Sequence, residues 1–135
     1  MRKSTRKILV TLLAIFFIAS SCNFVGDAKT KFARYCPGLK INTAGISYAY
    51  SNGKTFYVIS YDQSSQKEVK TYFEKKENGF GENKDSDLYD LKFNDDPAID
   101  KSDNILTKTI KHRKGSTVVV FNETTRRILI IDNDD

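Results

Sequence analysis

The segment from Gly45 to Tyr61 restricts the fold of this chain more than any other part of the sequence. β-branched and aromatic residues lie on both sides of Asn52-Gly53, and Asn-Gly is the strongest two-residue signal for a β-hairpin. A two-residue turn fixes the register of the two strands, so Ser51 pairs with Lys54. The pairs further from the turn are then Tyr50 with Thr55, Tyr48 with Tyr57, and Ile46 with Ile59.

One face of this hairpin is rich in tyrosine. Tyr48, Tyr50 and Tyr57 share that face, and Tyr61 continues it. Tyrosine offers a rigid contact area with a polar tip, so these four side chains form the candidate binding surface. The alternative is a half-buried sheet face, because tyrosine is simply a good strand former.

The other face of the hairpin combines small side chains with larger ones. Its pairs are Ala49 with Phe56 and Ser47 with Val58. This combination leaves room for a helix, and we expect a helix to pack closely there.

A helix of about three turns is predicted directly after the hairpin. Ser65 and Glu68 have the spacing of a capping box, which satisfies two amide donors at a helix start. Asn78-Gly79 tolerates the left-handed conformation that ends a helix. The apolar stripe of this helix consists of Val69, Tyr72 and Phe73.

The second half of the chain is dominated by predicted strands. A short strand is expected from Leu88 to Phe93, followed by an acidic loop from Asn94 to Asn104. Three antiparallel strands follow, Ile105 to Lys111, Ser116 to Phe121 and Arg126 to Asp132. The last two are apolar on both alternations, so we expect them at the centre of the sheet with both faces covered.

Together these elements predict an α+β fold with one domain. We expect a single antiparallel sheet of about five to six strands, made of the N-terminal hairpin and the C-terminal meander, with one helix packed on one face. The 135 residues leave room for only one core. The domain is expected to span residues 41–135, and residues 22–40 to form a lipid-anchored tether or a weak first helix.

The first twenty-two residues have the layout of a secretory signal. A basic region ends at Lys7, an apolar run extends from Ile8 to Ala19, and small residues precede Cys22. The run of twelve residues is about 18 Å long as a helix, too short for a bilayer core of roughly 30 Å. Residues 1–21 are therefore interpreted as a cleaved signal peptide.

Ala19-Ser20-Ser21-Cys22 resembles the bacterial lipoprotein signal, although Ala19 stands where Leu is usual. The resemblance covers residues 1–22 and implies that Cys22 receives a diacylglycerol before cleavage makes it the first residue. Two or three acyl chains would anchor the protein stably in a membrane. Asn23 replaces the Asp that retains lipoproteins at the inner membrane, which favours the outer membrane of a cell that has one.

The alternative is a soluble secreted protein cut by an ordinary signal peptidase. Apart from Cys22, the chain holds one cysteine, Cys36. An unlipidated chain in an oxidising compartment is expected to pair the two in a disulfide. Lipidation forbids that bridge and leaves Cys36 as a small buried hydrophobe.

The positive charge of the chain lies mainly in the signal peptide. The formal net charge is +5, but residues 1–21 hold four basic residues and no acid, so the remainder is nearly neutral. Lys111 to Lys114 and Arg126-Arg127 are basic clusters at opposite ends of one predicted strand, about 20 Å apart. One continuous basic patch is not expected, and neither is nucleic-acid binding.

Catalytic machinery is scarce in the sequence. It lacks the G-x-S-x-G, H-E-x-x-H, P-loop and dinucleotide-binding motifs, and we predict no cofactor. A single histidine, His112, excludes multi-histidine metal sites. It lies in a charged turn without the walls of an active site, so we interpret it as a surface residue.

Carboxylates leave two rival functions open. The acids lie in the loop around Asp96 and Asp100 and at the C-terminal end of the chain, without the spacing of an EF-hand. Calcium binding at the envelope is one alternative. A small envelope hydrolase or carbohydrate-active enzyme that uses Asp96 and Asp100 as paired acids is the other. Solvated acidic loops explain the same residues without a function.

The sequence therefore predicts a small envelope lipoprotein without enzymatic activity. Its partners would be the membrane, through the acyl chains on Cys22, and a protein at the envelope. Binding, assembly, or inhibition of a secreted protein in the manner of an immunity protein are the roles that this reading includes.

Overall fold

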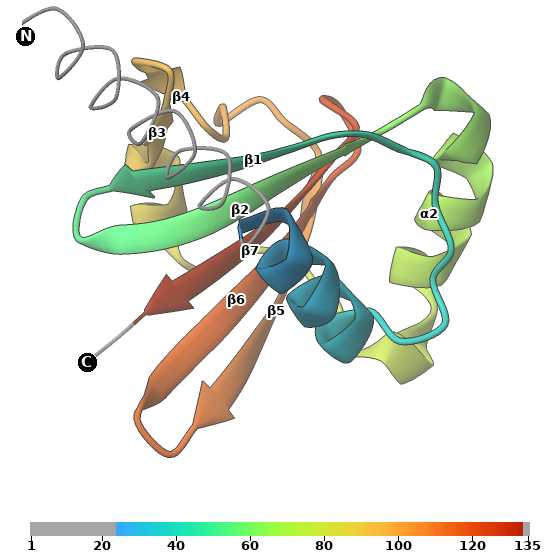
Figure 1. Cartoon of the computed structure of the whole chain (residues 1–135), viewed down its shortest axis with the longest axis horizontal. Coiled ribbons are helices and arrows are strands. Elements are labelled where there is room, and N and C mark those ends of the chain that lie inside the picture. The colour runs from blue at the N-terminus through green and yellow to red at the C-terminus, as the bar shows by residue number, and fades with distance from the viewer. Residues whose placement is uncertain (1–23, 134–135) are drawn as a thin grey trace, which may run out of the picture.

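A computed structural model of the chain describes residues 24–133 and shows an α+β fold (Figure 1). Its main element is a five-stranded antiparallel sheet with the order β1-β2-β7-β6-β5. The strands are β1 (Thr43–Ser51), β2 (Lys54–Tyr61), β5 (Ile105–His112), β6 (Gly115–Asn122) and β7 (Arg127–Asn133). The predicted signal peptide and Cys22 lie outside the described residues.

The predicted hairpin register is confirmed. Ser51 faces Lys54, and Tyr48 faces Tyr57, in the β1–β2 pair. Asn52 and Gly53 have φ values of 54° and 77°, the left-handed pair of conformations that a two-residue hairpin turn requires. A Gly in the second position adopts this backbone without steric cost.

The C-terminal meander is also confirmed, because β5 pairs with β6 and β6 pairs with β7. Strand β7 then pairs with β2, which joins the hairpin to the meander. Strands β6 and β7 therefore lie inside the sheet, as their apolar alternation on both faces predicted. Every residue of β6 from Thr117 to Asn122 is buried.

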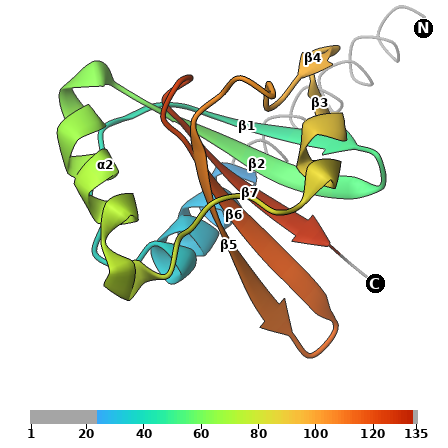
Figure 2. The same cartoon turned by 180° about the vertical axis from the view of Figure 1, so that it is seen from behind.

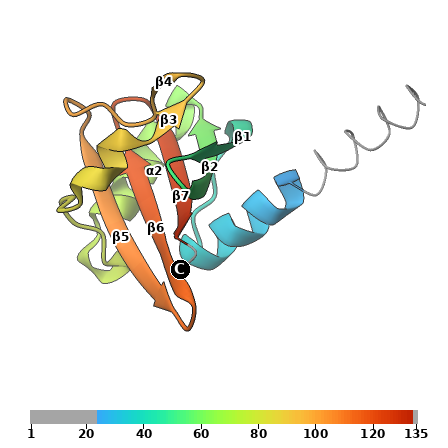
Figure 3. The same cartoon turned by 90° about the vertical axis from the view of Figure 1, so that its left-hand side faces the viewer.

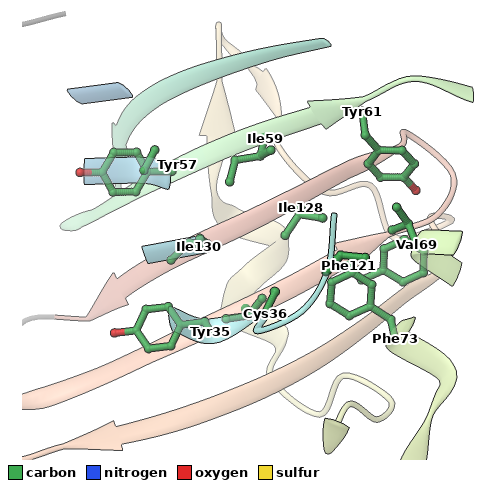
Figure 4. Packing of buried hydrophobic residues seen from close by; sticks show 13 residues of the cluster. Tyr35, Cys36, Tyr57, Ile59, Tyr61, Val69, Phe73, Phe121, Ile128 and Ile130 are labelled. Carbon is green, nitrogen blue, oxygen red and sulfur yellow. The ribbon is translucent and has the colours of Figure 1, made fainter. Parts of the chain in front are cut away.

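Two helices cover one face of the sheet (Figure 1). One runs through residues 24–35, and the other is α2 (Gln66–Glu74). In α2, Val69 and Phe73 are fully buried, and the Phe73 ring stacks on Phe121 of β6 with a centroid distance of 4.6 Å. Figure 4 shows this cluster, in which side chains of both helices meet those of β2, β6 and β7.

The opposite face is covered by the segment between α2 and β5, which lies in front of the sheet in Figure 2, where the molecule is seen from behind. This segment contains the 3-10 helix η3 (Ser86–Asp90) and the short pair β3 (Lys92–Phe93) and β4 (Asp96–Pro97). Leu88 and Leu91 are fully buried in the same cluster as Phe56. The expectation that the helix following the hairpin packs on the Ala49 and Phe56 face was therefore wrong, because α2 packs on the other face.

The predicted strand from Leu88 to Phe93 was wrong over most of its length. Leu88 and Leu91 are three residues apart and both enter one core, whereas a strand would direct them to opposite faces. The Asp85 side chain accepts a hydrogen bond from the Asp87 amide at 2.9 Å, which starts the 3-10 helix instead. Only Lys92 and Phe93 are extended.

The predicted capping box was wrong as well. Ser65 has helical backbone angles because a 3-10 turn, η1 (Gln63–Ser65), precedes α2. Its side chain makes no capping hydrogen bond, and its hydroxyl accepts from the Asn42 amide at 3.3 Å. Gly79, with φ of 78°, ends the 3-10 helix η2 (Lys76–Asn78) that follows α2.

The segment expected as a tether contributes to the core. Ala28 and Cys36 are buried, with 0% and 1% of their surfaces exposed. They belong to the cluster that contains Tyr57 and Ile130. As expected, Cys36 is a buried hydrophobe, and burial raises the pKa of its thiol to about 12. The helix through 24–35 therefore belongs to the folded domain.

Candidate functional site

An open cleft of about 800 Å³ lies between the helix through 24–35, the β1–β2 hairpin and the β5–β6 turn. These elements converge at the lower left of the sheet in Figure 1. The cleft combines cations with aromatic rings and, among the described residues, contains one carboxylate, Asp132. Its lining residues are Lys31, Arg34, Tyr35, Tyr48, Thr55, Tyr57, His112, Arg113, Lys114, Thr117 and Asp132.

One cation of the cleft is already neutralised. Lys31 forms a salt bridge with Asp132 of β7 and lies 3.9 Å from Asp27. Burial alone would lower the pKa of Lys31, but the hydrogen bond to Asp132 and the charges of Asp132 and Asp27 raise it. Tyr57 donates a hydrogen bond to Asp27, and burial together with this bond raises the pKa of its phenol. This network fastens the helix to the sheet.

His112 belongs to a second part of the network. Its Nε2 lies 2.8 Å from Thr117 Oγ1 and 3.3 Å from the Tyr35 hydroxyl. Thr117 Oγ1 donates to Asp132 at 2.9 Å and is buried. His112 is exposed, as expected, but it lines a cleft, so the expectation that its surroundings lack walls was wrong. The sequence did not show that Tyr35 and Asp132 would approach it.

The remaining cations of the cleft have no carboxylate partner within the described part of the chain. Neither Arg34, Arg113 nor Lys114 takes part in an ion pair there. Arg126 and Arg127 lie at the other end of β6, as predicted, so they do not extend the cleft. Such unpartnered guanidinium and ammonium groups are suited to bind phosphate or carboxylate groups.

The structure divides the four tyrosines of the predicted binding surface. Tyr48 and Tyr50 have 49% and 69% of their surfaces exposed, whereas Tyr57 and Tyr61 are buried. Tyr61 donates to Gln66 at 2.8 Å, and burial raises its pKa to about 12. Tyr57 and Tyr61 therefore fit the alternative interpretation, in which the tyrosines belong to a covered sheet face. Tyr48 and Tyr50 remain available for binding.

The two edges of the main sheet differ. On the β5 edge, Gly81 and Thr107 exchange backbone hydrogen bonds of 3.0 and 2.8 Å, and Lys108 and Lys111 add charge. Strand β1 forms the opposite edge, and residues 41–53 contain no charged side chain. Long uncharged edges are sites where another strand can pair. Exposed Tyr48 and Tyr50 lie on this open edge.

The acids of the rival functions do not line one cavity together within the described residues. Asp100 lines a small cavity whose lining does not include Asp96. The Asp100 carboxylate accepts hydrogen bonds from the Ser102 amide and hydroxyl, which lower its pKa, whereas a general acid needs a raised one. Within residues 24–133, no cluster of His, Cys, Asp and Glu has the arrangement of a metal site.

None of the helices within residues 24–133 combines the length and apolar character that a membrane crossing requires. Comparisons with known proteins found no match: no family model fits the chain, and no curated protein or solved structure is detectably similar to it.

Proposed function

We propose that this protein is a membrane-anchored, non-enzymatic binding protein of the bacterial envelope, with the outer membrane favoured. Its anchor is the acylated Cys22, and its binding site is the open edge of β1, to which a strand of a partner protein adds. The observation that carries this proposal is a nine-residue edge strand without charge, with two exposed tyrosines. Adding a strand combines backbone hydrogen bonds with side-chain contacts.

In the proposed complex, the partner would bind the backbone groups of β1 that do not pair with β2, and the register identifies those groups. In an antiparallel hairpin, hydrogen-bonded and non-hydrogen-bonded pairs alternate, and the pair that flanks a two-residue turn is hydrogen-bonded. Ser51 and Lys54 are that pair, so Tyr50 and Tyr48 belong to non-hydrogen-bonded pairs. Their amide and carbonyl groups therefore point away from β2, toward the open edge.

The anchor is tested by intact mass and membrane partitioning of the natively expressed protein beside a Cys22→Ser variant. We expect a membrane-bound native protein that is heavier by its acyl chains, and a variant that is released or left unprocessed. A soluble, unmodified native protein with a Cys22–Cys36 disulfide would overturn the anchor.

The binding edge is tested with two substitutions at one position. Tyr50→Pro removes an amide donor that points outward, whereas Tyr50→Thr removes the ring and keeps the amide. A photo-crosslinking phenylalanine analogue at Tyr48, in intact cells, reports which protein lies against the edge. We expect one cross-linked partner, lost with Tyr50→Pro and retained, although reduced, with Tyr50→Thr.

Equal cross-linking in the two variants would contradict strand addition. A cross-link between two copies of this chain, with no other partner, would mean that the protein self-assembles through this edge and would contradict a separate partner protein. Both variants are expected to fold, because β1 pairs with β2 through backbone groups that these substitutions leave in place. Circular dichroism of both variants checks this.

A further inference from the structure

The chain between the acylation site and the folded domain is very short. Phe24 already packs on the domain, with its ring centroid 5.4 Å from that of Tyr48 and 5.5 Å from that of Tyr57. Cys22 is two residues earlier, a span of at most about 7 Å. A domain held by acyl chains on Cys22 would not stand away from the bilayer, and Phe24 would lie at the interface where aromatic rings are favoured.

The basic cleft lies next to this attachment point. Tyr48 and Tyr57, which contact Phe24, also line the cleft. Figure 3 shows the helix through 24–35 leaving the sheet with its N-terminal end directed outward, on the side opposite η3, β3 and β4. An acyl chain attached beyond that end therefore places the helix side of the molecule toward the membrane.

Charge is distributed unequally between the two sides. Residues 85–103, which cover the face remote from this helix, contain seven aspartates and two lysines. The cleft carries Arg34, Arg113 and Lys114, which form no ion pair within the described residues, and the described acids beside it, Asp27 and Asp132, are bound to Lys31. An anionic surface attracts the cleft and repels the opposite layer.

We propose that the cleft docks on anionic lipid headgroups of the membrane that holds the acyl chains, with Arg34, Arg113 and Lys114 contacting their phosphates. The proposal rests on the anchor at Cys22 but not on the edge of β1. Docking fixes the orientation of the domain, so the layer of residues 85–103 faces away from the bilayer.

The test measures lysine reactivity in the acylated native protein, after intact mass has verified the acyl chains on the same sample. The protein is added to preformed vesicles of phosphatidylcholine, with or without phosphatidylglycerol, and treated with a membrane-impermeant amine reagent. Mass spectrometry then quantifies the modification of Lys114, in the cleft, and of Lys101, in the opposite layer. Phosphatidylglycerol is expected to reduce the modification of Lys114 about fivefold and to leave Lys101 unchanged.

Two variants with the same loss of charge make the test specific. Arg34→Gln/Arg113→Gln should abolish the protection of Lys114, whereas Lys67→Gln/Lys75→Gln, on and beside α2, should preserve it. Protection that is absent in acylated protein overturns docking and leaves the anchor intact. Protection by inorganic phosphate alone, on neutral vesicles, also overturns docking, because the cleft would then be a site for free phosphate. A sample without acyl chains overturns the anchor at Cys22 and, with it, the docking.

Discussion

Ala28 provides the sharpest test that the N-terminal helix belongs to the fold. Its side chain is fully buried, in the cluster that also contains Tyr35, Tyr57 and Ile130. The Ala28→Leu variant adds three carbon atoms to a position with no exposed surface. A tether would accommodate this change freely, whereas a packed helix must move or distort its neighbours.

The size of the effect follows from core packing. Overpacking a well-filled core costs about 1–3 kcal/mol, although the added methyl groups recover part of that by burial. In a domain of roughly 100 residues, each kcal/mol lowers the Tm by about 4 °C or more. We therefore expect the Tm of Ala28→Leu to fall by roughly 5–15 °C.

The measurement is thermal unfolding, followed by circular dichroism, of the processed chain with Cys22→Ser. Thr30→Leu is the matched control, because Thr30 is exposed on the same helix. A substitution at such a surface position changes the free energy of unfolding by about 0.5 kcal/mol or less. If Ala28→Leu and Thr30→Leu unfold at the same temperature, the helix does not contribute to the core and this reasoning is refuted.

Three further predictions concern the rest of the domain. Phe73→Ala should lower the free energy of unfolding by about 3–5 kcal/mol in denaturant titrations, since it empties a site stacked on Phe121. Gly53→Ala should cost about 1–2 kcal/mol, because Gly53 has φ of 77°, whereas Gly45→Ala should cost less. The Cys36 thiol, with pKa raised from 9.0 to about 12, keeps its proton in the folded state after the unfolded state has lost it. The contribution of Cys36 to stability should therefore fall between pH 9 and 12, by up to about 4 kcal/mol. Cys36→Ala should remove this contribution and leave the fall above pH 10 that the raised pKa values of Tyr57 and Tyr61 cause.

Local sequence patterns predicted the sheet well. The Asn52-Gly53 turn fixed the register of β1 and β2, because its geometry and the alternation of side chains act over a few residues. The apolar runs Val118 to Val120 and Ile128 to Ile131 placed β6 and β7 inside the sheet for the same reason.

Long-range packing was not predictable in this way. The segment around Leu88 and Leu91 occupies the hairpin face on which we expected the helix. Both leucines enter the core on that face, and only the three-dimensional structure reveals this. Nor did Ser65 act as a cap, because its hydroxyl bonds to the amide of Asn42, a residue distant in the chain. Such contacts override local propensity.

The cleft was missed because its residues come from separate elements. Lys31 and Arg34 lie on the helix through 24–35, while Arg113 and Lys114 lie in the β5–β6 turn. A signal for that helix was present: Phe24, Ala28, Phe32 and Tyr35 have helical spacing. This apolar stripe predicts a helix that packs on the sheet. Lys31 and Arg34 lie beside the stripe, so they are candidates to share a site with the basic β5–β6 turn.

The proposed binding edge and the proposed membrane-docking cleft can operate together, because they face different directions. A strand added to β1 extends the sheet sideways, within its own plane, whereas the cleft opens on the helix-covered face. Tyr48 would take part in both through different groups, its backbone at the edge and its ring beside the cleft. Cross-linking from the edge should therefore survive in Arg34→Gln/Arg113→Gln, while Tyr50→Pro should leave the protection of Lys114 intact. Loss of both activities in either variant would mean that the two surfaces form one site.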